Sequence, residues 1–460
     1  MDICSYLFKK AKRKTIVPFI LCLLLTACGG SGSVVVKPTP TPQPPTYSSN
    51  TGTSVPYPTD STKDIYHCTY QSYYPSCLTP HALRVAYSIE PLTEKGFTGK
   101  GQTVVLIESF GSSTLQKDVD FFDKQFDLPP ITVQQIDPIH EPQSGSNNDR
   151  VGWAGETTGD VEIIHAIAPD AKIVVLVSPV DETEGTVGLP EFRQLIQYTI
   201  DHKLGYIISE SWGASEATLK DATGQTEVQK WDALYKQATT QDAMTILAAS
   251  GDNGATDYSN LQATQLATTP TVSFPIDDPW VTSAGGTSLR FDGTTFSETS
   301  DHESGGGLSA FFPEPVYQQQ LPASVQHLLH KQRGIPDVSA NADGVNPLAI
   351  YVQGQWSLGT GTSVAAPLWA GLIAIANQMV GHPLGFINPA LYKLAASSHY
   401  EQDFHDITTG NNSVDGSNVV NQSGLSIPGY NAVPGWDAVT SLGSPDAVHL
   451  LPDLIAAESG

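Results

Sequence analysis

Short apolar runs alternate with helix-like stretches over most of this chain, and this alternation restricts its fold more than any other feature. Four runs are rich in Val, Ile and Leu and end at polar residues or glycine, as buried parallel strands do: 102–109, 171–178, 204–212 and 243–250. Four segments between them are candidate helices: 115–126, 156–168, 190–202 and 228–240. This alternation predicts an α/β fold with a mostly parallel central sheet, helices on both faces, and functional groups at the carboxyl ends of the strands.

The first 27 residues have the organisation of a secretory signal. Basic residues at 9–14 precede an apolar stretch at 15–27 that is too short to cross a bilayer comfortably. The stretch ends in Leu-Thr-Ala-Cys-Gly, which resembles the bacterial lipobox, where cleavage precedes a cysteine that receives lipid. We therefore expect residues 1–27 to be a lipoprotein signal peptide and Cys28 to be lipidated. The protein would then be exported and anchored to a membrane, as a bacterial lipoprotein of the outer membrane, periplasm or cell surface.

Residues 28–60 are rich in Gly, Ser, Pro and Thr, so we expect a tether, with its Pro-rich part extended. Residues 61–460 would form one domain. Cys68 and Cys77 are the cysteines left in the exported chain after Cys28. In an oxidising compartment a pair nine residues apart favours a disulfide over two free thiols.

The charge of the chain excludes one class of partner. The chain has 47 acidic and 23 basic residues, a formal net charge of -24, which argues against binding to a phosphate backbone and hence to nucleic acid. A solvated surface is the simplest explanation for this acidity. Repulsion among carboxylates weakens as the pH falls, so an acidic environment would suit the chain.

The motif with the most distinctive composition is GTGTSVAAPLWAGLIAIANQ at 359–378. A turn of small residues leads Ser363 into the first turn of a long apolar helix. Its hydroxyl would lie beside free backbone N–H groups, near the positive end of the helix dipole. An acyl-transfer nucleophile needs that arrangement, although a helix-capping serine would also account for this residue taken alone.

Two carboxylates in the segment 155–173 could serve such a serine. Glu156 and Asp160 are four residues apart, so on a helix they project from the same face. One carboxylate could accept the serine proton while the other holds the first in place. We expect the pair in the first turns of the helix, where negative charge is favoured, and this dipole effect is also the alternative explanation for both residues.

Gly361, Thr362, Ser363 and Pro367 together resemble the nucleophile segment that subtilisins and sedolisins share. The His-Gly-Thr-His block of subtilisins and their early Asp-Ser/Thr-Gly strand end are absent, and His165 is expected to be a core or helix-surface histidine. The spacing of the two carboxylates instead matches the Glu-x-x-x-Asp of sedolisins. The resemblance is closest to kumamolisin-like members, and it implies a subtilisin-like fold.

The resemblance runs from about residue 83 to residue 454 and implies four catalytic residues: Glu156, Asp160, Asp252 and Ser363. Glu156 would act as general base and then general acid, oriented by Asp160, while Ser363 forms the acyl-enzyme. Asp252 follows the strand at 246–250 and would stabilise the oxyanion, which a carboxyl group can do only when protonated. Turn chemistry alone would also explain an aspartate there.

Two further positions match the family around this site. Glu108 would be hydrogen-bonded into the catalytic network, and Trp212 would lie in the strand beside the substrate.

The segments 404–412 and 433–445 resemble the family's calcium site. The resemblance implies one structural Ca²⁺ held by two carboxylates and three backbone carbonyls, from Asp406, Asp437, Ile407, Val433 and Gly435. Oxygen ligands of this kind suit Ca²⁺. The family usually has glycine where this chain has Val433, and two Asx turns are the alternative explanation.

Secreted sedolisins are generally made with a long N-terminal prodomain, but only about fifty residues separate Cys28 from the catalytic body. We therefore expect no prodomain, with folding unaided or activity controlled by pH alone. The sequence predicts a monomeric, acid-acting serine peptidase with polypeptide substrates, and endopeptidase and tripeptidyl-aminopeptidase action both stay open. Two alternatives are a catalytically silent binding protein of the same fold and an ester hydrolase. Four filled catalytic positions argue against the first, and the peptide-binding strand around Trp212 argues against the second.

Overall fold

The computed structural model describes residues 77–291, 295–415 and 425–458, together with the backbone of three short strands before residue 77. Those three strands are β1 (Thr46–Ser48), β2 (Ser54–Pro56) and β3 (Ile65–Tyr66). The expected signal peptide and most of the expected tether therefore lie outside the described residues, as do Cys28 and Cys68.

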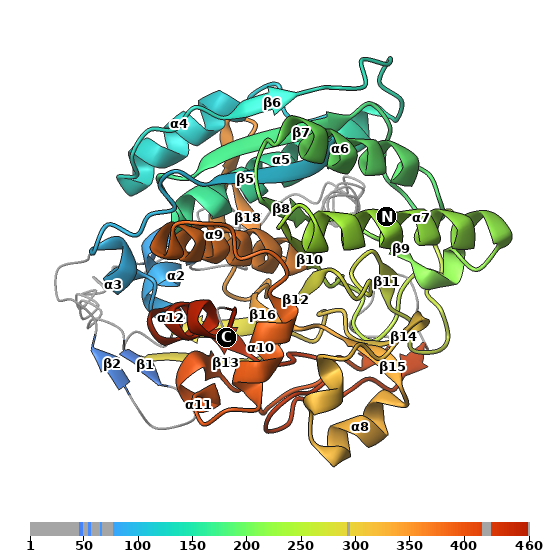
Figure 1. The fold of residues 1–460 in the computed structure, drawn as a ribbon. Coiled ribbons are helices and arrows are strands. Elements are labelled where there is room, and N and C mark those ends of the chain that lie inside the picture. Colours follow the sequence, from blue (N-terminus) through green and yellow to red (C-terminus); the bar gives the residue numbers. More distant parts are fainter. Residues whose placement is uncertain are drawn as a thin grey trace, which may run out of the picture.

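Parallel strands form the centre of the molecule (Figure 1). Their order in the described part of the chain is β6–β7–β5–β8–β10–β12–β16. Their bounds are β5 Thr103–Ser109, β6 Gln134–Ile136, β7 Lys172–Ser178, β8 Ile207–Glu210, β10 Thr245–Ala249, β12 Thr282–Phe291 and β16 Val338–Asn341. The antiparallel strand β13 (Thr295–Ser300) pairs with β12. The expected α/β architecture with a mostly parallel sheet is confirmed.

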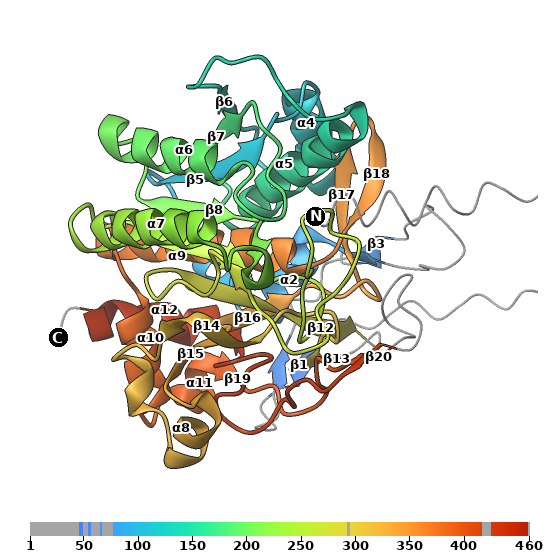
Figure 2. The same ribbon diagram turned by 90° about the vertical axis from the view of Figure 1, so that its right-hand side faces the viewer.

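Helices cover both faces of this sheet, as the side view in Figure 2 shows. The helices are α2 Pro80–Ala86, α3 Glu90–Thr93, α4 Leu115–Phe126, α5 Asn147–Ile167, α6 Leu189–His202, α7 Ala222–Thr240, α8 Ala323–Leu329, α9 Thr362–Val380, α10 Asn388–Ala395, α11 Tyr400–Asp403 and α12 Ala447–Glu458. Successive side chains of a strand point to opposite faces. Accordingly Val104 and Leu106 of β5 join the core that contains α5 and α9, whereas Val105 and Ile107 join the core that contains α6 and α7.

Smaller strands complete the fold: β4 Cys77–Leu78, β9 Ala214–Ser215, β11 Ser273–Phe274, β14 Gly307–Pro313, β15 Gln332–Ile335, β17 Leu348–Val352, β18 Gln355–Gly359, β19 Phe404–His405, β20 Val414–Asp415, β21 Ser426–Ile427 and β22 Ser444–Pro445. The hairpin β17–β18 runs directly into the start of α9.

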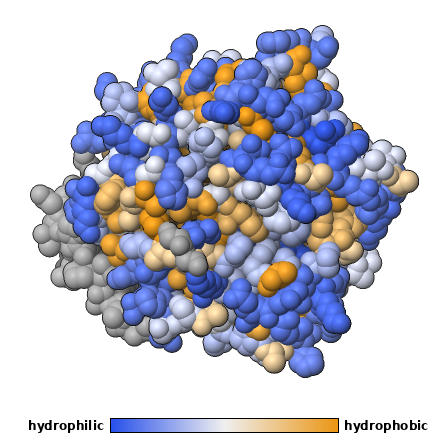
Figure 3. Space-filling model, in the orientation of Figure 1, coloured by the Kyte–Doolittle hydropathy of each residue, from blue (hydrophilic) through white to orange (hydrophobic). Residues whose placement is uncertain are grey.

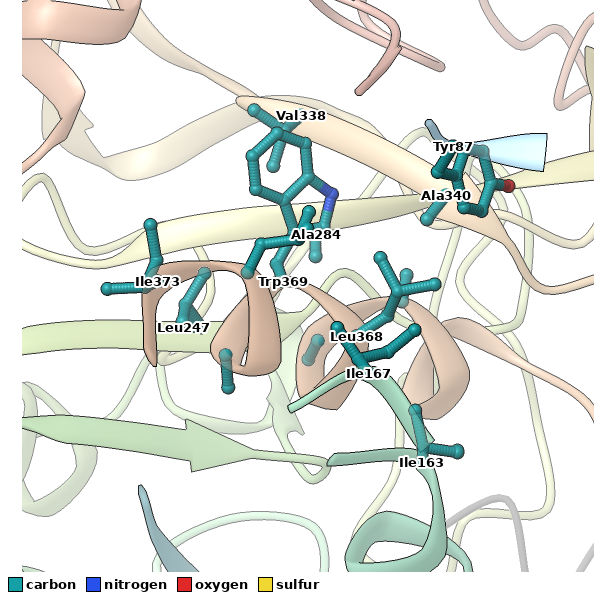
Figure 4. Packing of buried hydrophobic residues seen from close by; sticks show 14 of the residues in the cluster. Tyr87, Ile163, Ile167, Leu247, Ala284, Val338, Ala340, Leu368, Trp369 and Ile373 are labelled. Atoms are coloured by element: carbon teal, nitrogen blue, oxygen red, sulfur yellow. The ribbon is translucent and has the colours of Figure 1, made fainter. Parts of the chain in front are cut away.

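The long helix α9 runs through the interior. It is apolar and long enough to cross a membrane, but 83% of its most apolar window is buried, which is typical of a core helix. Figure 4 shows Leu368 of α9 beside Ile167 of α5, and Trp369 directed at Ala284 and Val338 of the sheet. These contacts fix the position of the helix that begins next to Ser363.

Helix α5 begins earlier than expected, at Asn147. Ser146 accepts a hydrogen bond from the backbone N–H of Asp149, and the Asp149 carboxylate accepts one from the backbone N–H of Ser146 in a capping box. Glu156 and Asp160 therefore lie in the middle of the helix. The expectation that they lie in its first turns is wrong, and the helix dipole does not explain them.

Candidate active site

Glu156 and Asp160 of α5 lie close to Glu108 near the carboxyl end of β5. Asp160 is 1% exposed, and its Oδ2 accepts a hydrogen bond of 2.7 Å from Ser211 Oγ, directly after β8. Glu108 in β5 is hydrogen-bonded to Asp160 and accepts a 3.4 Å hydrogen bond from Thr157. Glu156 lies one helical turn before Asp160, close enough for its charge to act on that residue. The structure thus brings Glu156, Asp160 and Glu108 together.

Burial and mutual repulsion disfavour the state in which Glu156 and Asp160 are both ionised. Burial raises the pKa of Asp160 well above its usual value, and the charge of Glu156 raises it further. Hydrogen bonds from Ser211 and Glu108 oppose the shift. Glu156 and Asp160 can therefore share one proton at acid pH, which is the state that a carboxylate base held by a neighbouring carboxyl requires.

Asp252 caps the helix that carries Ser363. The N-cap residue of α9 is Gly361, which has no side chain that could cap the helix. Asp252, which follows β10, accepts the capping hydrogen bond instead. Asp252 Oδ1 accepts hydrogen bonds from Thr362 N (2.8 Å) and Thr362 Oγ1 (2.9 Å). Thr362 Oγ1 in turn accepts a hydrogen bond from Gly251 N, which locks the two segments together.

The other oxygen of Asp252 is the one that can carry a proton. Its Oδ2 is buried and has no hydrogen-bond partner among the described residues, whereas Oδ1 already has two donors. Burial raises the pKa of Asp252 to about 7, helped by the charges of Glu303 and Asp301 and opposed by the Thr362 hydrogen bonds. Asp252 is therefore a neutral acid below about pH 7, with its proton available on Oδ2.

Gly361 makes room for that oxygen. It has a φ of +90°, and a Cβ added there would lie 2.5 Å from Asp252 Oδ2. We expect Gly361→Ala to push Asp252 aside and to lower kcat by about 10-fold or more, because a displaced donor stabilises an oxyanion poorly. The matched control is Gly381→Ala at the other end of α9, where φ is +84° and an added Cβ meets nothing within 4 Å. Both variants carry the backbone strain of positive φ. Steady-state kinetics that showed equal losses for the two would contradict the displacement of Asp252.

Ser363 is the second residue of α9 and is 5% exposed. Its Oγ has no hydrogen-bond partner among the described residues. The hydroxyl is therefore not used as a helix cap. Ser363 itself stands in the first turn of a long apolar helix, as expected from the sequence.

A pocket opens beside Asp252 and Thr362. Its wall contains Trp212, which is 3% exposed and packs against Phe192 and Trp231. The pocket is lined by Glu184, Ser211, Trp212, Gly213, Ala249, Gly251, Asp252, Asn253, Asp257, Tyr258, Ser273, Ile276, Glu303, Thr360, Gly361 and Thr362. Trp212 thus shares the wall of a pocket with Asp252, but it lies between β8 and β9 and not, as had been expected, in a strand.

Hydrogen bonds join the two carboxylates that are expected to bind calcium to the loop at 433–437. Asp406 Oδ2 accepts a 3.0 Å hydrogen bond from Gly435 N, and Asp437 Oδ2 accepts one of the same length from Val433 N. Gly435 has a φ of +78°, whereas Val433 is not among the residues with positive φ. A valine is therefore no obstacle to the turn. With Ile407 directly after Asp406, the segments offer carboxylate and carbonyl oxygens, a donor set that fits Ca²⁺.

Two further expectations concern a disulfide at Cys77 and the position of His165. Cys77 is buried and disulfide-bonded, while its expected partner Cys68 lies outside the described residues. His165 is fully buried and contacts Pro129 O and Asp123, so it is a core histidine.

Sequence reasoning missed the roles of Ser211 and Thr362 in holding the candidate carboxylates. Both residues stand in segments that the sequence analysis singled out, 204–212 and 359–378, next to Trp212 and Ser363.

Comparisons with known proteins relate the chain to subtilases and to sedolisin-type peptidases. The subtilase family model matches residues 145–390. Kumamolisin from Bacillus sp. (strain MN-32) is 32% identical over 399 residues, covering 85% of this chain and 66% of that protein. Tripeptidyl-peptidase 1 of Canis lupus familiaris is 31% identical over 320 residues, covering 66% of this chain and 52% of that protein.

A solved structure resembles this one along most of its length. It is a Pseudomonas sedolisin, described as a serine-carboxyl proteinase complexed with two molecules of pseudo-iodotyrostatin. The TM-score is 0.63 at 27% identity, covering 77% of this chain and 92% of the other.

The matched family model, which covers more than half of the chain, shows that the chain belongs to the subtilase family, and the fold agrees with it. Within that family it is of the sedolisin type, with kumamolisin among its relatives. The chain spans 66% of the length of kumamolisin and about half the length of the tripeptidyl-peptidases.

Proposed function

We propose that this protein is an acid-acting serine-carboxyl peptidase that hydrolyses peptide bonds through an acyl-enzyme on Ser363. The observation that carries this proposal is the position of Asp252. It is a buried carboxyl group, neutral below about pH 7, tied by Thr362 to the helix of the nucleophile. A neutral carboxyl group can donate a hydrogen bond to an oxyanion, which an ionised carboxylate cannot.

In the proposed acylation step, Ser363 Oγ attacks the carbonyl carbon of the peptide bond and passes its proton to Glu156. Asp160 holds Glu156 in place and limits the charge on the pair. The carbonyl oxygen becomes negatively charged and accepts a hydrogen bond from the protonated Oδ2 of Asp252, beside the N–H groups of α9. When the intermediate collapses, the C–N bond breaks and Glu156 gives its proton to the departing amine.

Deacylation repeats these roles with water. Glu156 takes a proton from the water molecule as its oxygen attacks the ester carbonyl, and Asp252 again stabilises the oxyanion. Collapse breaks the ester bond and returns the proton to Ser363 Oγ, so the enzyme is regenerated and the second product is a carboxylic acid.

The test is a pH profile of hydrolysis for the parent protein and for Asp252→Asn, with an unfolded protein as substrate. Activity of the parent should fall as the pH rises through about 7, because Asp252 loses its proton there. In Asp252→Asn the amide can still accept from Thr362 through oxygen and donate through nitrogen at every pH. The decline near pH 7 that belongs to residue 252 should therefore disappear.

Two results would count against the mechanism: a parent optimum above about pH 7, away from ordinary carboxyl values, or the same alkaline decline in both proteins. Cleavage of esters without cleavage of unfolded protein would favour the ester hydrolase. Binding of peptides without any turnover would favour the silent binding protein.

We also propose one structural Ca²⁺ at Asp406 and Asp437, with carbonyls of Ile407, Val433 and Gly435. Asp437 is 1% exposed, and the two carboxylates come from segments about thirty residues apart, so binding of an ion would offset the entropic cost of closing that loop. We expect chelation to lower the thermal midpoint and to increase cleavage by added protease. Asp437→Ala should abolish the response to chelator. A chelator that stops turnover while leaving the thermal midpoint unchanged would contradict a structural role.

The lipobox-like sequence that ends at Cys28 supports a further proposal, that the protein is exported and anchored through lipid on Cys28. Cell fractionation checks this, since Cys28→Ala should release the protein from the membrane fraction. Unchanged fractionation together with no lipid labelling of the parent would contradict it.

A further inference from the structure

Two buried carboxyl groups that the proposed mechanism does not use lie against each other in the interior. Glu216 is 2% exposed and Asp277 is completely buried. Asp277 is close enough to Glu216 for a hydrogen bond between the two carboxyl groups. Ser309 Oγ, also completely buried, lies 2.7 Å from Glu216 Oε1 and 2.6 Å from Asp277 Oδ2. The three side chains therefore form one hydrogen-bonded cluster.

This cluster joins three segments, two of which supply part of the wall of the pocket beside Asp252. Glu216 directly follows β9, Asp277 lies three residues after β11, and Ser309 is in β14. Strands β9 and β11 pair with each other. The first two segments also supply three lining residues of the pocket: Gly213, Ser273 and Ile276. A change in the cluster would therefore affect the pocket wall.

The hydrogen bonds of the cluster require a proton on one of the two carboxyl groups. Ser309 Oγ has a single hydrogen, so it can donate to only one carboxylate. It also accepts hydrogen bonds from the backbone N–H groups of Phe311 (3.0 Å) and Phe312 (2.9 Å). If both carboxyl groups were ionised, the remaining short contacts would bring acceptors together without a hydrogen between them. One proton shared by Glu216 and Asp277 removes this conflict.

Asp277 is the group that carries this proton. Glu216 accepts backbone hydrogen bonds from Ala310, at 2.9 Å to Oε1 and 3.0 Å to Oε2, and from Phe311 at 3.3 Å. These donors favour the ionised form of Glu216. Asp277 Oδ1 has no hydrogen-bond partner among the described residues. Burial raises the pKa of Asp277 well above its usual value and the charge of Glu216 raises it further, while the hydrogen bond from Ser309 opposes the shift.

The charged groups around the cluster do not replace this proton. Asp278, the next residue, is also completely buried, and its charge raises the pKa of Asp277 as well. Two further carboxyl groups interact with Asp278, from α7 and β8: Asp232 and Glu210. Arg333 of β15 acts on Asp278 too, but it forms an ion pair with Asp337. Loss of the shared proton would therefore add a negative charge to a group of carboxyls.

We propose that the proton shared by Glu216 and Asp277 holds the wall of the pocket beside Asp252 in place and makes that wall sensitive to pH. With the proton, the cluster joins β9, β11 and β14. Without it, two adjacent carboxylates repel each other and the three segments separate. The inference concerns the regulation of the proposed function and rests on it for the effect on activity. It is independent of the proton on Asp252, because it concerns the pocket wall and not the oxyanion.

The direction of the pH effect follows from the raised pKa of Asp277. A carboxyl group of this kind stabilises the folded state below its ordinary pKa, and the stabilisation is lost as the pH rises through the folded-state value. The thermal midpoint of the parent should therefore fall between about pH 5 and about pH 8.5. In Asp277→Asn the amide keeps the size of the side chain and donates to Glu216 at every pH. The fall should then be smaller by about 3 °C or more.

Recovery of activity separates this effect from the titration of Asp252. The protein is kept at about pH 8.5 for increasing times, returned to about pH 4.5 and assayed, so that a proton lost from Asp252 is regained before the assay. We expect the remaining, irreversible inactivation to be about 10-fold slower in Asp277→Asn than in the parent, the factor that corresponds to one unit of pKa. The matched control is Asp201→Asn, which removes an exposed carboxylate near the end of α6 and should inactivate at the rate of the parent.

A second variant tests which carboxyl group holds the proton. Glu216→Gln keeps the size of the side chain but removes the carboxylate to which Ala310 and Phe311 donate. It should lower the thermal midpoint already at about pH 5, whereas Asp277→Asn should not.

Hydrogen exchange gives a reading that does not depend on turnover. At about pH 8.5, after correction for the intrinsic exchange rate, amides at 309–313 should lose protection in the parent and keep it in Asp277→Asn. The amides of β7, in the central sheet, should keep their protection in both proteins.

Three results would overturn the inference: a parent thermal midpoint that does not fall over this pH range, an Asp277→Asn protein that inactivates as fast as the parent, or protection by Glu216→Gln in its place. A stabilised fold in Asp277→Asn together with a parent that cleaves no peptide would leave the inference about the wall standing and contradict the proposed function instead.

Discussion

Replacing Ser363 with alanine is expected to lower kcat by about 10⁴-fold or more, the largest effect among the expected results. Without Oγ no acyl-enzyme can form, and only the oxyanion donor and substrate binding remain to promote attack by water. The main-chain position of residue 363 is held by α9 and by the contact between Thr362 and Asp252, so the fold should survive. The measurement is kcat on the best peptide, with the thermal midpoint as a check on folding.

The matched control is Ser398→Ala, a change of the same kind at an exposed position. It should retain the activity of the parent. A Ser363→Ala protein that kept more than about 1% of kcat would show that another group is the nucleophile.

Replacing Arg333 with methionine is expected to have the largest effect on stability. Arg333 and Asp337 form an ion pair with no exposed surface, in which Nη1 lies 2.8 Å from Oδ1. The carboxylate also accepts hydrogen bonds from Tyr392 and Ser283. Arg333→Met would leave this charge buried without its partner, and such a loss typically costs about 3–5 kcal/mol. Urea unfolding near pH 7 measures it.

An ion pair that has a second cation provides the comparison. Arg193, whose side chain is 28% exposed, lies 2.8 Å from the largely buried Glu227. Glu227 also pairs with Lys230, so Arg193→Met leaves that carboxylate with a partner and should cost only about 0–1 kcal/mol. Losses of equal size in Arg333→Met and Arg193→Met would contradict the part assigned to the unpaired buried charge.

Local sequence patterns predicted which helices and strands form better than they predicted where those elements begin and end. The candidate helix 115–126 coincides with α4, and the four apolar runs contain β5, β7, β8 and β10. The start of α5 was missed because Ser146 and Asp149 lie in a polar segment with no apolar periodicity. What begins that helix is a capping box, a feature of two side chains and their backbone partners.

In the candidate site too, the sequence predicts local spacing but not contacts between distant segments. The spacing of Glu156 and Asp160 follows from helical geometry, so the sequence alone predicts that they lie on one face. The contacts of Asp160 with Ser211 and of Asp252 with Thr362 join residues 51 and 110 positions apart. Sheet topology creates these contacts, and no local periodicity records them.

A solvated surface explains the acidity of the chain only in part. Figure 3 shows a largely hydrophilic surface, in keeping with solvated charge. Other carboxyl groups lie inside the protein, however. Burial raises the pKa of Glu210 to about 8, and Ser309 Oγ hydrogen-bonds both Glu216 and Asp277 in the interior. Counting charges cannot separate these two populations, because it carries no information about burial.

The late position of α9 in the chain has a consequence for the timing of activity. The strands and helices before residue 300 contain the carboxylates, but the nucleophile arrives only with a helix that must insert against α5, β8, β10 and β12. Asp252 likewise gains its hydrogen bonds only when Thr362 docks. A partial chain that ends before α9 would therefore lack both the proposed nucleophile and the docked Asp252. Under the proposed function, the order of the segments would delay proteolysis by a chain until its own body is complete.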